Sequence, residues 1–241
     1  MRYLINNSTD PHFNMALDEW CLEHLDVSVP VFYLWRNRPS VIIGLNQDAE
    51  AEVNIEYIKK HGITLARRVT GGGAVYHDLQ NMNYSIIGHN ADSTPFVNAL
   101  RTLGVDARLS GRNDIFVDGK KVSGYARRIW KDREIVHGTL MYDVDIETLT
   151  KALDTPSSKL TQKGIASVRS RVTNLKDYLP QFRNLDELQN ALHEIMAGND
   201  TEIVLGENDI KEIRALSDSK FSTREWLFRK VADRSGHGDE M

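Results

Sequence analysis

The residues best suited to chemistry are a glycine triplet, Gly71–Gly73, and two arginines just before it, Arg67 and Arg68. Glycines strip the side chains from a short loop, so its backbone N–H groups can approach a ligand beside fixed positive charge. This combination suits a phosphate or a carboxylate. It is not a P-loop, because no Gly-Lys-Ser/Thr follows, and it is not a dinucleotide fingerprint, because the glycines are contiguous. A glycine-rich hairpin turn with nothing bound is the alternative.

A second segment, residues 111–126, carries groups that could act on such a ligand. The Asp-Gly pair at 118–119 predicts a hairpin turn, after which Lys121 begins a strand. A lysine at a strand edge, followed by small residues, can reach into a pocket. Asn113 could supply a hydrogen bond, and Asp114 a metal-binding carboxylate. Alternatively, Lys120 and Lys121 are solvated turn lysines, since lysine is rarely buried.

The elements that must position these residues follow from hydrophobic periodicity and turn residues. We expect strands at 2–5, 31–35, 41–44, 64–68, 73–77, 83–88, 115–117, 121–130 and 135–142, with one more at 201–205. We expect helices at 14–25, 55–61 and 94–103, the first of them amphipathic, and mostly helices from residue 146 onward. The sequence therefore predicts an α/β domain of the α+β type, built on a mixed, mostly antiparallel sheet packed with helices.

Composition excludes several classes of protein. The chain has 241 residues, of which 30 are basic and 34 acidic. Its net charge of −4 does not show the excess of basic residues that is typical of nucleic-acid-binding proteins. Its single cysteine, Cys21, excludes an internal disulfide and suits a reducing cytoplasm. The N-terminus turns polar at once, so we expect neither a signal peptide nor a membrane span, and we expect a cytoplasmic location.

Together, the two segments resemble the lipoate–protein ligase A family of the biotin/lipoate protein ligase superfamily. The resemblance runs from about Leu4 to about Pro180. Its pieces stand in the family's order: Phe13-Asn14-Met15-Ala16 with Asp18-Glu19, Leu34-Trp35-Arg36-Asn37, Ala66 to Asp78, Ser110 to Asp114, Lys121-Val122-Ser123-Gly124, His137-Gly138-Thr139-Leu140 and Lys163 to Leu175. The resemblance implies the biotin/lipoate ligase catalytic-domain fold.

The resemblance also implies a two-step reaction that needs ATP and Mg²⁺. The carboxylate of lipoate attacks the α-phosphate of ATP, which gives lipoyl-adenylate and pyrophosphate. A lysine of an acceptor protein then attacks the mixed anhydride and displaces AMP. The acceptors it implies are apo-lipoyl domains of 2-oxoacid dehydrogenase complexes or the glycine cleavage H protein. Neither step needs an enzyme nucleophile, so positioning and charge stabilisation carry the catalysis.

By the same resemblance, Lys121 is the catalytic lysine, and its charge would lie between the lipoyl carbonyl and the α-phosphate. Asp114 is either a magnesium ligand or the partner that orients Lys121. His77 is a site histidine hydrogen-bonded within the loop rather than a zinc ligand, because zinc needs three or four ligands. The other implied substrate- or nucleotide-binding residues are Arg68, Gly73, Ala74, Val75, Tyr76, Asn81, Asn113, His137 and Thr139.

Residues 1–229 are expected to form the catalytic domain and residues 230–241 a disordered tail. The C-terminal accessory domain of longer family members is expected to be absent, and a separate accessory chain could replace it in the adenylation step. Three other functions compete. One is a lipoyl or octanoyl transferase with a cysteine nucleophile, for which only Cys21 is available. The others are a biotin–protein ligase and a non-catalytic lipoate-binding protein.

A basic run, Arg127, Arg128, Lys131 and Arg133, is either a solvated strand face or a surface that attracts an acidic acceptor domain.

Overall fold

The computed structural model describes residues 1–110, 113–153 and 172–230. Parts of two family-like segments, Gly111-Arg112 and residues 163–171, lie outside the described residues, as does the predicted tail from 231 onward. Within the described ranges no helix combines the length and apolar character needed to cross a membrane.

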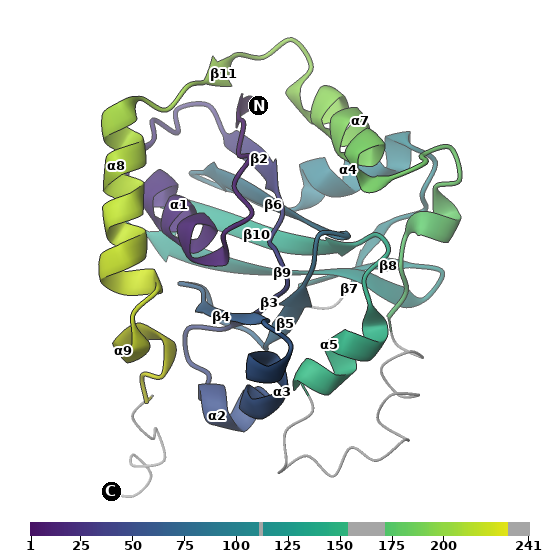
Figure 1. Ribbon diagram of the computed structural model, residues 1–241. Coiled ribbons are helices and arrows are strands. Elements are labelled where there is room, and N and C mark those ends of the chain that lie inside the picture. Colours follow the sequence, from purple (N-terminus) through teal and green to yellow (C-terminus); the bar gives the residue numbers. More distant parts are fainter. Residues whose placement is uncertain (111–112, 154–171, 231–241) are drawn as a thin grey trace, which may run out of the picture.

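The larger of two sheets forms the body of the molecule (Figure 1). Most pairings between its described strands are antiparallel, and β1 pairs in parallel with β2 and β11. Its strands lie in the order β11 (Glu202–Ile203), β1 (Arg2–Leu4), β2 (Val31–Trp35), β6 (Asn81–Gly88), β10 (Arg133–Met141), β9 (Lys120–Trp130), β8 (Asp114–Val117) and β7 (Arg108–Ser110).

A smaller sheet lies beside it and carries the glycine triplet (Figure 1). Its strand order is β4 (Thr64–Arg67), β3 (Ser40–Ile43) and β5 (Val75–His77). The triplet connects β4 to β5, on either side of the central strand. Three short helices pack around this sheet: α2 (Ala49–Glu52), α3 (Ile55–Lys60) and α5 (Ile146–Leu153).

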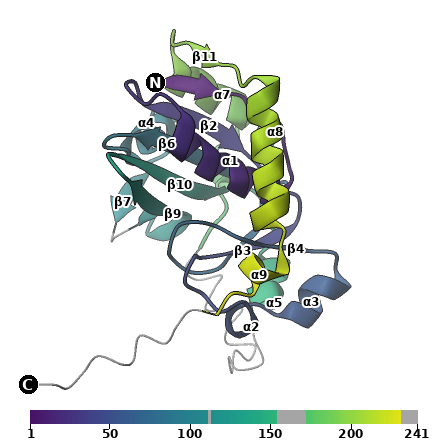
Figure 2. The same ribbon diagram turned by 90° about the vertical axis from the view of Figure 1, so that its left-hand side faces the viewer.

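Helices cover both faces of the large sheet because its strands alternate apolar side chains between two cores. On β2, Phe32 and Leu34 join the core formed with α4 (Thr94–Thr102) and α7 (Leu185–Ala197). Tyr33 and Trp35 face the opposite core, formed with α1 (Pro11–His24) and α8 (Glu207–Leu216). Figure 2 shows α1 and α8 running side by side, and the two helices are also in contact.

The described C-terminal part also contains a 3₁₀ turn, η1 (Lys176–Tyr178), before α7, and a π-helical turn, η2 (Ser217–Phe221), before α9 (Arg224–Leu227).

The predicted hairpin turn at 118–119 is present. Its two residues have φ values of 49° and 74°, both in the left-handed region that an Asp-Gly hairpin turn requires.

The predicted mixed, mostly antiparallel architecture is confirmed, with two corrections. First, the strands form two sheets, and the sequence pattern missed β7 and α2. Second, α1 is not amphipathic: it lies between the large sheet, β4 and α8, so nearly its whole length is buried. Asp10 caps its N-terminus by accepting from the N–H groups of His12 and Phe13. Polar groups of α1 therefore lie in the interior, next to the site.

Candidate functional site

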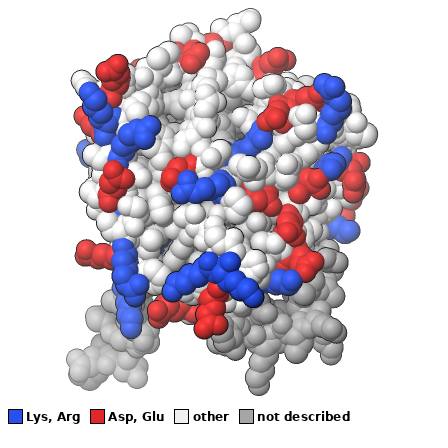
Figure 3. Space-filling view, in the orientation of Figure 1, with Lys and Arg blue, Asp and Glu red and all other residues white. Residues whose placement is uncertain are grey.

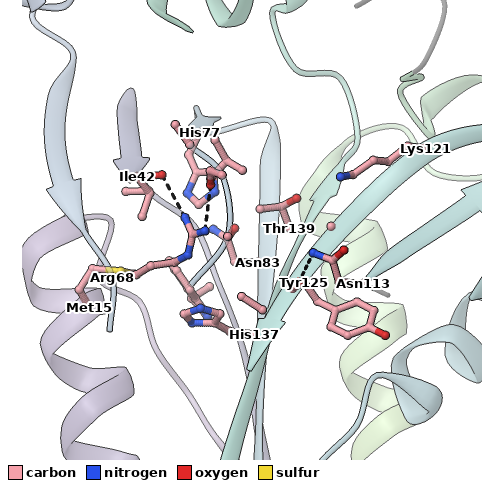
Figure 4. Close-up of a pocket in the computed structure, with 18 residues that line it drawn as sticks. Met15, Ile42, Arg68, His77, Asn83, Asn113, Lys121, Tyr125, His137 and Thr139 are labelled. Carbon is pink, nitrogen blue, oxygen red and sulfur yellow. Dashed lines mark hydrogen bonds between the residues drawn. The ribbon is translucent and has the colours of Figure 1, made fainter. Parts of the chain in front are cut away.

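A pocket of about 650 Å³, counting the space at its mouth, lies between the two sheets (Figure 4). Its apolar wall comes from Met15, Trp35, Ile42 and Val75, which leaves room for an apolar ligand chain. The remaining lining residues are Arg68, Gly72, Gly73, Ala74, His77, Asn83, Asn113, Lys121, Gly124, Tyr125, Ala126, His137, Gly138 and Thr139.

The floor of the pocket is one face of the large sheet, where side chains two residues apart point the same way. Asn83 pairs with Trp35 on one side and Thr139 on the other. Two residues further along β6, Ser85 pairs with His137, which in turn pairs with Ala126. Most of these side chains are small or polar, so this face leaves space under the second sheet instead of filling it.

An irregularity in β9 directs Lys121 into the pocket. The β8–β9 pairing runs regularly through Ser123 and Gly124, then shifts by one residue, so Val122 is extra. In a regular strand Lys121 and Gly124 would face opposite sides. Here both line the pocket, while Val122 and Ser123 are both buried. A β-bulge thus sets the direction of the lysine, as bulges near active sites commonly do.

Lys121 lies across Gly124 and forms an ion pair with Asp114, whose Oδ1 is 2.7 Å from Nζ. A Cβ at position 124 would lie 2.9 Å from Nζ, so the absence of a side chain there makes room for the ammonium group. The Lys121 side chain is 37% exposed, which lets a ligand or an acceptor reach it. Asn113 lies nearby and donates from Nδ2 to the carbonyl oxygen of Tyr125.

Arg68 forms the centre of the glycine loop (Figure 4). Its Nη2 donates to the carbonyl oxygens of Gly71 and Gly73, at 2.8 and 2.9 Å, and its Nη1 donates to that of Ile42, at 3.1 Å. Its Nε donates to Thr70 Oγ1 and to the Gly71 carbonyl. Burial lowers the pKa of Arg68 to about 10, so it stays charged at neutral pH. Arg68 therefore shapes the loop and also adds positive charge to the pocket wall.

This packing around the guanidinium group explains the middle glycine of the triplet, Gly72. Gly72 has a φ of 97°, and a Cβ there would lie 2.9 Å from Arg68 Nη2. The carbonyl oxygen of Gly72 in turn approaches Gly44, where a Cβ would be only 2.1 Å from it. At Gly71 and Gly73 a Cβ would meet nothing within 4 Å, so these positions are open.

Arg67, the preceding residue, ties the same loop region to the C-terminal segment. Its guanidinium donates to the carbonyl oxygens of Trp226 and Leu227, and to those of Gly44 and Gln47 in the segment after β3. In return, Trp226 Nε1 donates to the Arg67 carbonyl oxygen at 3.0 Å.

A buried polar network beneath the pocket connects α1 to the loop. Asp18 Oδ2 lies 2.6 Å from His137 Nδ1, and His137 Nε2 lies 2.6 Å from Thr70 Oγ1, which accepts from Arg68. Tyr33 and Ser85 both donate to Asp18 Oδ1. His137 therefore lies between the α1 carboxylate and the loop hydroxyl.

His77 lines the opposite wall and is 3% exposed. Its Nδ1 lies 3.0 Å from Asn37 Nδ2. Burial, followed by the electrostatic effects of Arg68 and His137, lowers the pKa of His77 to about 3. The imidazole is therefore neutral at physiological pH.

Most of the residues implied by sequence resemblance are brought together here. Those that line the pocket are Arg68, Gly73, Ala74, Val75, His77, Asn113, Lys121, His137 and Thr139. Asp114 does not line the wall but pairs with Lys121. Tyr76 faces the other side of β5, in the core of the small sheet, and Asn81 Nδ2 donates to Asn83 Oδ1. Neither reaches the pocket wall directly.

The sequence pattern missed Asp18, Thr70, Asn83 and Ser85. Asn83 and Ser85 could have been found, because they lie opposite the predicted residues Thr139 and His137 on an alternating strand. The signal for Asp18 was its place in the family-like piece Asp18-Glu19, but its pairing with His137, 119 residues away, could not be predicted from the sequence.

Cys21 is fully buried in the core between α1 and the large sheet and does not line the pocket. Burial, and then the charge of Asp18, raise the pKa of its thiol well above the ordinary value. Such a thiol is a packing group rather than an activated nucleophile.

The basic run on β9 and β10 is largely paired. Arg127 pairs with Glu134 at 2.6 Å, Arg128 with Glu19 at 2.9 Å, and Arg133 donates to the carbonyl oxygen of Leu25. On the face seen in Figure 3, basic and acidic side chains are interspersed. The paired arginines favour the interpretation of a solvated strand face.

Comparisons with known proteins agree with this geometry. Residues 10–197 match the family model described as the lipoyl protein ligase A/B catalytic domain. The lipoate-protein ligase LplJ of Bacillus subtilis is 40% identical over 236 residues, covering 92% of this chain and 71% of that protein.

Three solved structures are similar over nearly the whole chain. A bipartite lipoate protein ligase from Thermoplasma acidophilum, studied with its E2 lipoyl domain, has a TM-score of 0.85 and 33% identity, covering 97% of this chain and 98% of that one. A lipoate-protein ligase A bound with ATP has a TM-score of 0.82 and 32% identity, with coverages of 95% and 99%. LipL1 of P. falciparum in complex with lipoate has a TM-score of 0.79 and 28% identity, with coverages of 96% and 75%.

Proposed function

The chain belongs to the lipoyl protein ligase A/B catalytic-domain family, and we propose that it attaches lipoate to a lysine of an acceptor lipoyl domain, using ATP. The observation that carries this proposal is the meeting of three features in one pocket. These are an apolar wall, the glycine loop around Arg68, and the ammonium group of Lys121. The first suits the acyl chain, and the other two suit the phosphate and the acyl oxygen.

In the first step, an oxygen of the lipoate carboxylate forms a bond to the α-phosphorus of ATP, and the bond to the pyrophosphate leaving group breaks. Negative charge that develops on the phosphate would face Lys121, which would act as a fixed cation without transferring a proton. The wall formed by Met15, Trp35 and Ile42 would hold the acyl chain and exclude water from the mixed anhydride.

In the second step, the amine of the acceptor lysine attacks the lipoyl carbonyl carbon. The bond to the phosphate oxygen breaks, AMP leaves, and the amine loses a proton to solvent water. Lys121 would stabilise the same oxygens again, which is why one residue serves both steps. Its partial exposure provides the route by which the acceptor would enter.

Magnesium belongs to the proposal as part of the ATP substrate. Among the described residues no cluster of three His, Cys, Asp or Glu side chains could hold a metal unaided. Asp114, the carboxylate next to Lys121, fits the usual arrangement in which Mg²⁺ takes one or two carboxylates and the phosphates of the nucleotide. The ion would neutralise phosphate charge.

The partners also belong to the proposal. A structural relative was studied with its E2 lipoyl domain, which supports acceptors of this class. We extend the proposal to the glycine cleavage H protein. Because that relative is bipartite, we further propose that a separate accessory chain assists adenylation. A cytoplasmic location is proposed from the composition, with residues 1–229 as the catalytic unit.

The transferase alternative needs a cysteine nucleophile, and the burial of Cys21 away from the pocket argues against it. One assay separates the alternatives: incubate the protein with lipoate, Mg²⁺, labelled ATP and an apo-lipoyl domain. We expect release of labelled AMP and an acceptor mass increase equal to one lipoyl group. Transfer from an acylated carrier without ATP would indicate a transferase, and lipoate binding without turnover would indicate a binding protein.

A further inference from the structure

Two of the family-like segments, residues 13–16 and 34–37, contribute asparagines that meet behind His77. Asn14 Nδ2 lies 2.8 Å from Asn37 Oδ1, and Asn37 Nδ2 lies 3.0 Å from His77 Nδ1. Asn14 is 1% exposed and Asn37 is fully buried. Neither asparagine lines the pocket, so their role must be exerted through His77.

Backbone contacts fix the direction of this hydrogen-bond chain. Asn14 Nδ2 also lies 2.9 Å from the carbonyl oxygen of Arg36 and 3.1 Å from that of Ser8. Carbonyl oxygens only accept, so this end of the Asn14 amide must be its NH₂ group. Its two hydrogens serve three acceptors, so one hydrogen is shared between two of them. The third acceptor is Asn37 Oδ1, which leaves the NH₂ group of Asn37 facing His77. A flipped Asn37 would place two NH₂ groups against each other.

The direction determines which ring nitrogen of His77 carries the proton. Because Asn37 donates to Nδ1, that nitrogen must accept, and in a neutral imidazole the hydrogen then belongs to Nε2. The depressed pKa of His77 agrees with a neutral ring. Nε2 is buried, and no described residue offers it an acceptor. A buried donor without a partner is costly, so one on a pocket wall indicates where a ligand acceptor belongs.

Asn83 provides a second, independent observation of the same kind. It also lines the pocket, its Oδ1 accepts from Asn81, and its Nδ2 has no partner among the described residues. Two donors without partners therefore belong to one cavity whose other walls are largely apolar. They suit a ligand with an oxygen acceptor on an apolar chain.

We propose that His77 donates its Nε2–H to an acyl oxygen of the bound lipoyl substrate, and that Asn37, held by Asn14, is the positioning residue that fixes this tautomer. The assignment rests on the proposed function, because that function supplies the ligand. Hydrogen bonding by a neutral ring recognises the oxygen without adding a third positive charge beside Arg68 and Lys121.

The first test uses the wild-type protein without ligand. Nitrogen-15 NMR of the histidine rings, with His77 assigned by its loss in His77→Gln, should show a neutral ring protonated on Nε2. In Asn37→Asp the isosteric carboxylate can only accept, so the proton should move to Nδ1. A wild-type ring protonated on Nδ1 would overturn the proposal without any variant having to fold.

The second test measures lipoate affinity by calorimetry. His77→Gln, whose amide NH₂ can occupy the Nε2 position, should bind within about threefold of wild type. His77→Leu and Asn37→Asp should bind about 10- to 100-fold more weakly, the usual effect of losing one hydrogen bond to a charged or strongly polar acceptor. Asn98→Asp, on the exposed side of α4, is the matched control and should bind as wild type does.

The outcomes separate this proposal from the proposed function. If the wild-type protein bound no lipoate, both would fail. If it bound lipoate and His77→Leu bound it equally well, only the role of His77 would fail. Equal losses in His77→Gln and His77→Leu would indicate that His77 merely fills space, and would also overturn the proposal.

Discussion

At the scale of single residues, Lys121 is the side chain on which the proposed chemistry depends most. Replacing it with alanine removes the cation and leaves Asp114 Oδ1, a buried atom, without its ion-pair partner. We expect the rate of lipoyl transfer to fall by about 10²–10³, the usual effect of losing one preorganised electrostatic group, while the protein remains folded.

The matched control for that change is Lys120→Ala, since Lys120 is the exposed neighbour at the start of β9. Transfer rates from lipoyl-adenylate to an apo-lipoyl domain, measured by intact mass, would compare the two. Near-normal transfer by Lys121→Ala, or a large loss in Lys120→Ala, would show that the assignment is wrong.

Cys21 should have no chemical role. In Cys21→Ser we expect ligation at the wild-type rate, and a free energy of unfolding lower by about 1–3 kcal/mol because a hydroxyl is placed in the apolar core. Denaturant unfolding and the ligation assay measure the two effects separately. A folded Cys21→Ser protein without activity would support a cysteine-dependent transferase instead.

His77 should make the protein less stable in mild acid. Its pKa is about 3 in the folded protein against an ordinary value of 6.5, so between these values the unfolded chain binds more protons. The native state therefore loses stability as the pH falls through 6.5, by at most about 2 kcal/mol between pH 7 and pH 5.

Urea unfolding at several pH values would test this dependence in wild type and in His77→Gln. The variant should lose less stability between pH 7 and pH 5 than the wild type does. His61→Gln, at an exposed position, should keep the wild-type dependence. A variant curve parallel to the wild-type curve would show that His77 is not the group responsible.

Site residues could be predicted from the sequence where the residue type alone indicates the role, as a lysine does by its charge and a glycine by its lack of a side chain. Lys121 and the glycine loop could be recognised, and Lys121, Gly72 and Gly73 line the same pocket. The contacts of Arg68 could not be predicted, because sequence shows a positive charge but not which carbonyl oxygens its donors meet. Asp18 could not be predicted either, since its partners come from other strands.

At the scale of elements, the bulge in β9 and the glycine that follows it set the position of the lysine. Gly124→Ala would place a Cβ 2.9 Å from Lys121 Nζ and 3.0 Å from its Cε. The flexible end of the lysine can move aside, so stability should change by less than about 1 kcal/mol. The ammonium group would be displaced, and we expect transfer to slow by about 10- to 100-fold.

Gly71→Ala is the matched control, because a Cβ there meets nothing within 4 Å. Transfer rate and unfolding free energy would be measured for both variants. A Gly124→Ala enzyme as fast as Gly71→Ala would mean that Lys121 does not need its observed position.

Apart from β7 and α2, the elements before residue 146 were predicted to within a few residues, because strand alternation and turn residues are local signals. The Asp-Gly turn at 118–119 is an example. The character of α1 was mispredicted for a physical reason: it is covered by strands of both sheets and by α8, and its polar residues find internal partners. No periodicity can indicate that a polar side chain will be buried and satisfied. Likewise, alternation does not reveal how strands are divided between two sheets.

At the scale of the whole molecule, the chain matches one component of a bipartite relative along almost its full length. Transfer from preformed lipoyl-adenylate needs the pocket, Lys121 and an acceptor, whereas ATP activation also needs the pyrophosphate to be held. We therefore expect this chain alone to use lipoyl-adenylate faster than lipoate with ATP. The mass increase of the acceptor domain, followed over time at the same enzyme concentration, would measure both rates. Equal rates would contradict the expectation.

The clasp of Arg67 on the carbonyl oxygens of Trp226 and Leu227 has a consequence for protein engineering. The base of the glycine loop and the last described helix, α9, share one guanidinium group. Trimming the chain back past Thr223 would leave that buried cation without two of its acceptors, directly behind the ligand pocket. A change in the C-terminal segment should therefore alter the site. A bulky fusion or a strain sensor attached there would displace the Arg67 guanidinium and, with it, the loop where the nucleotide is expected to bind.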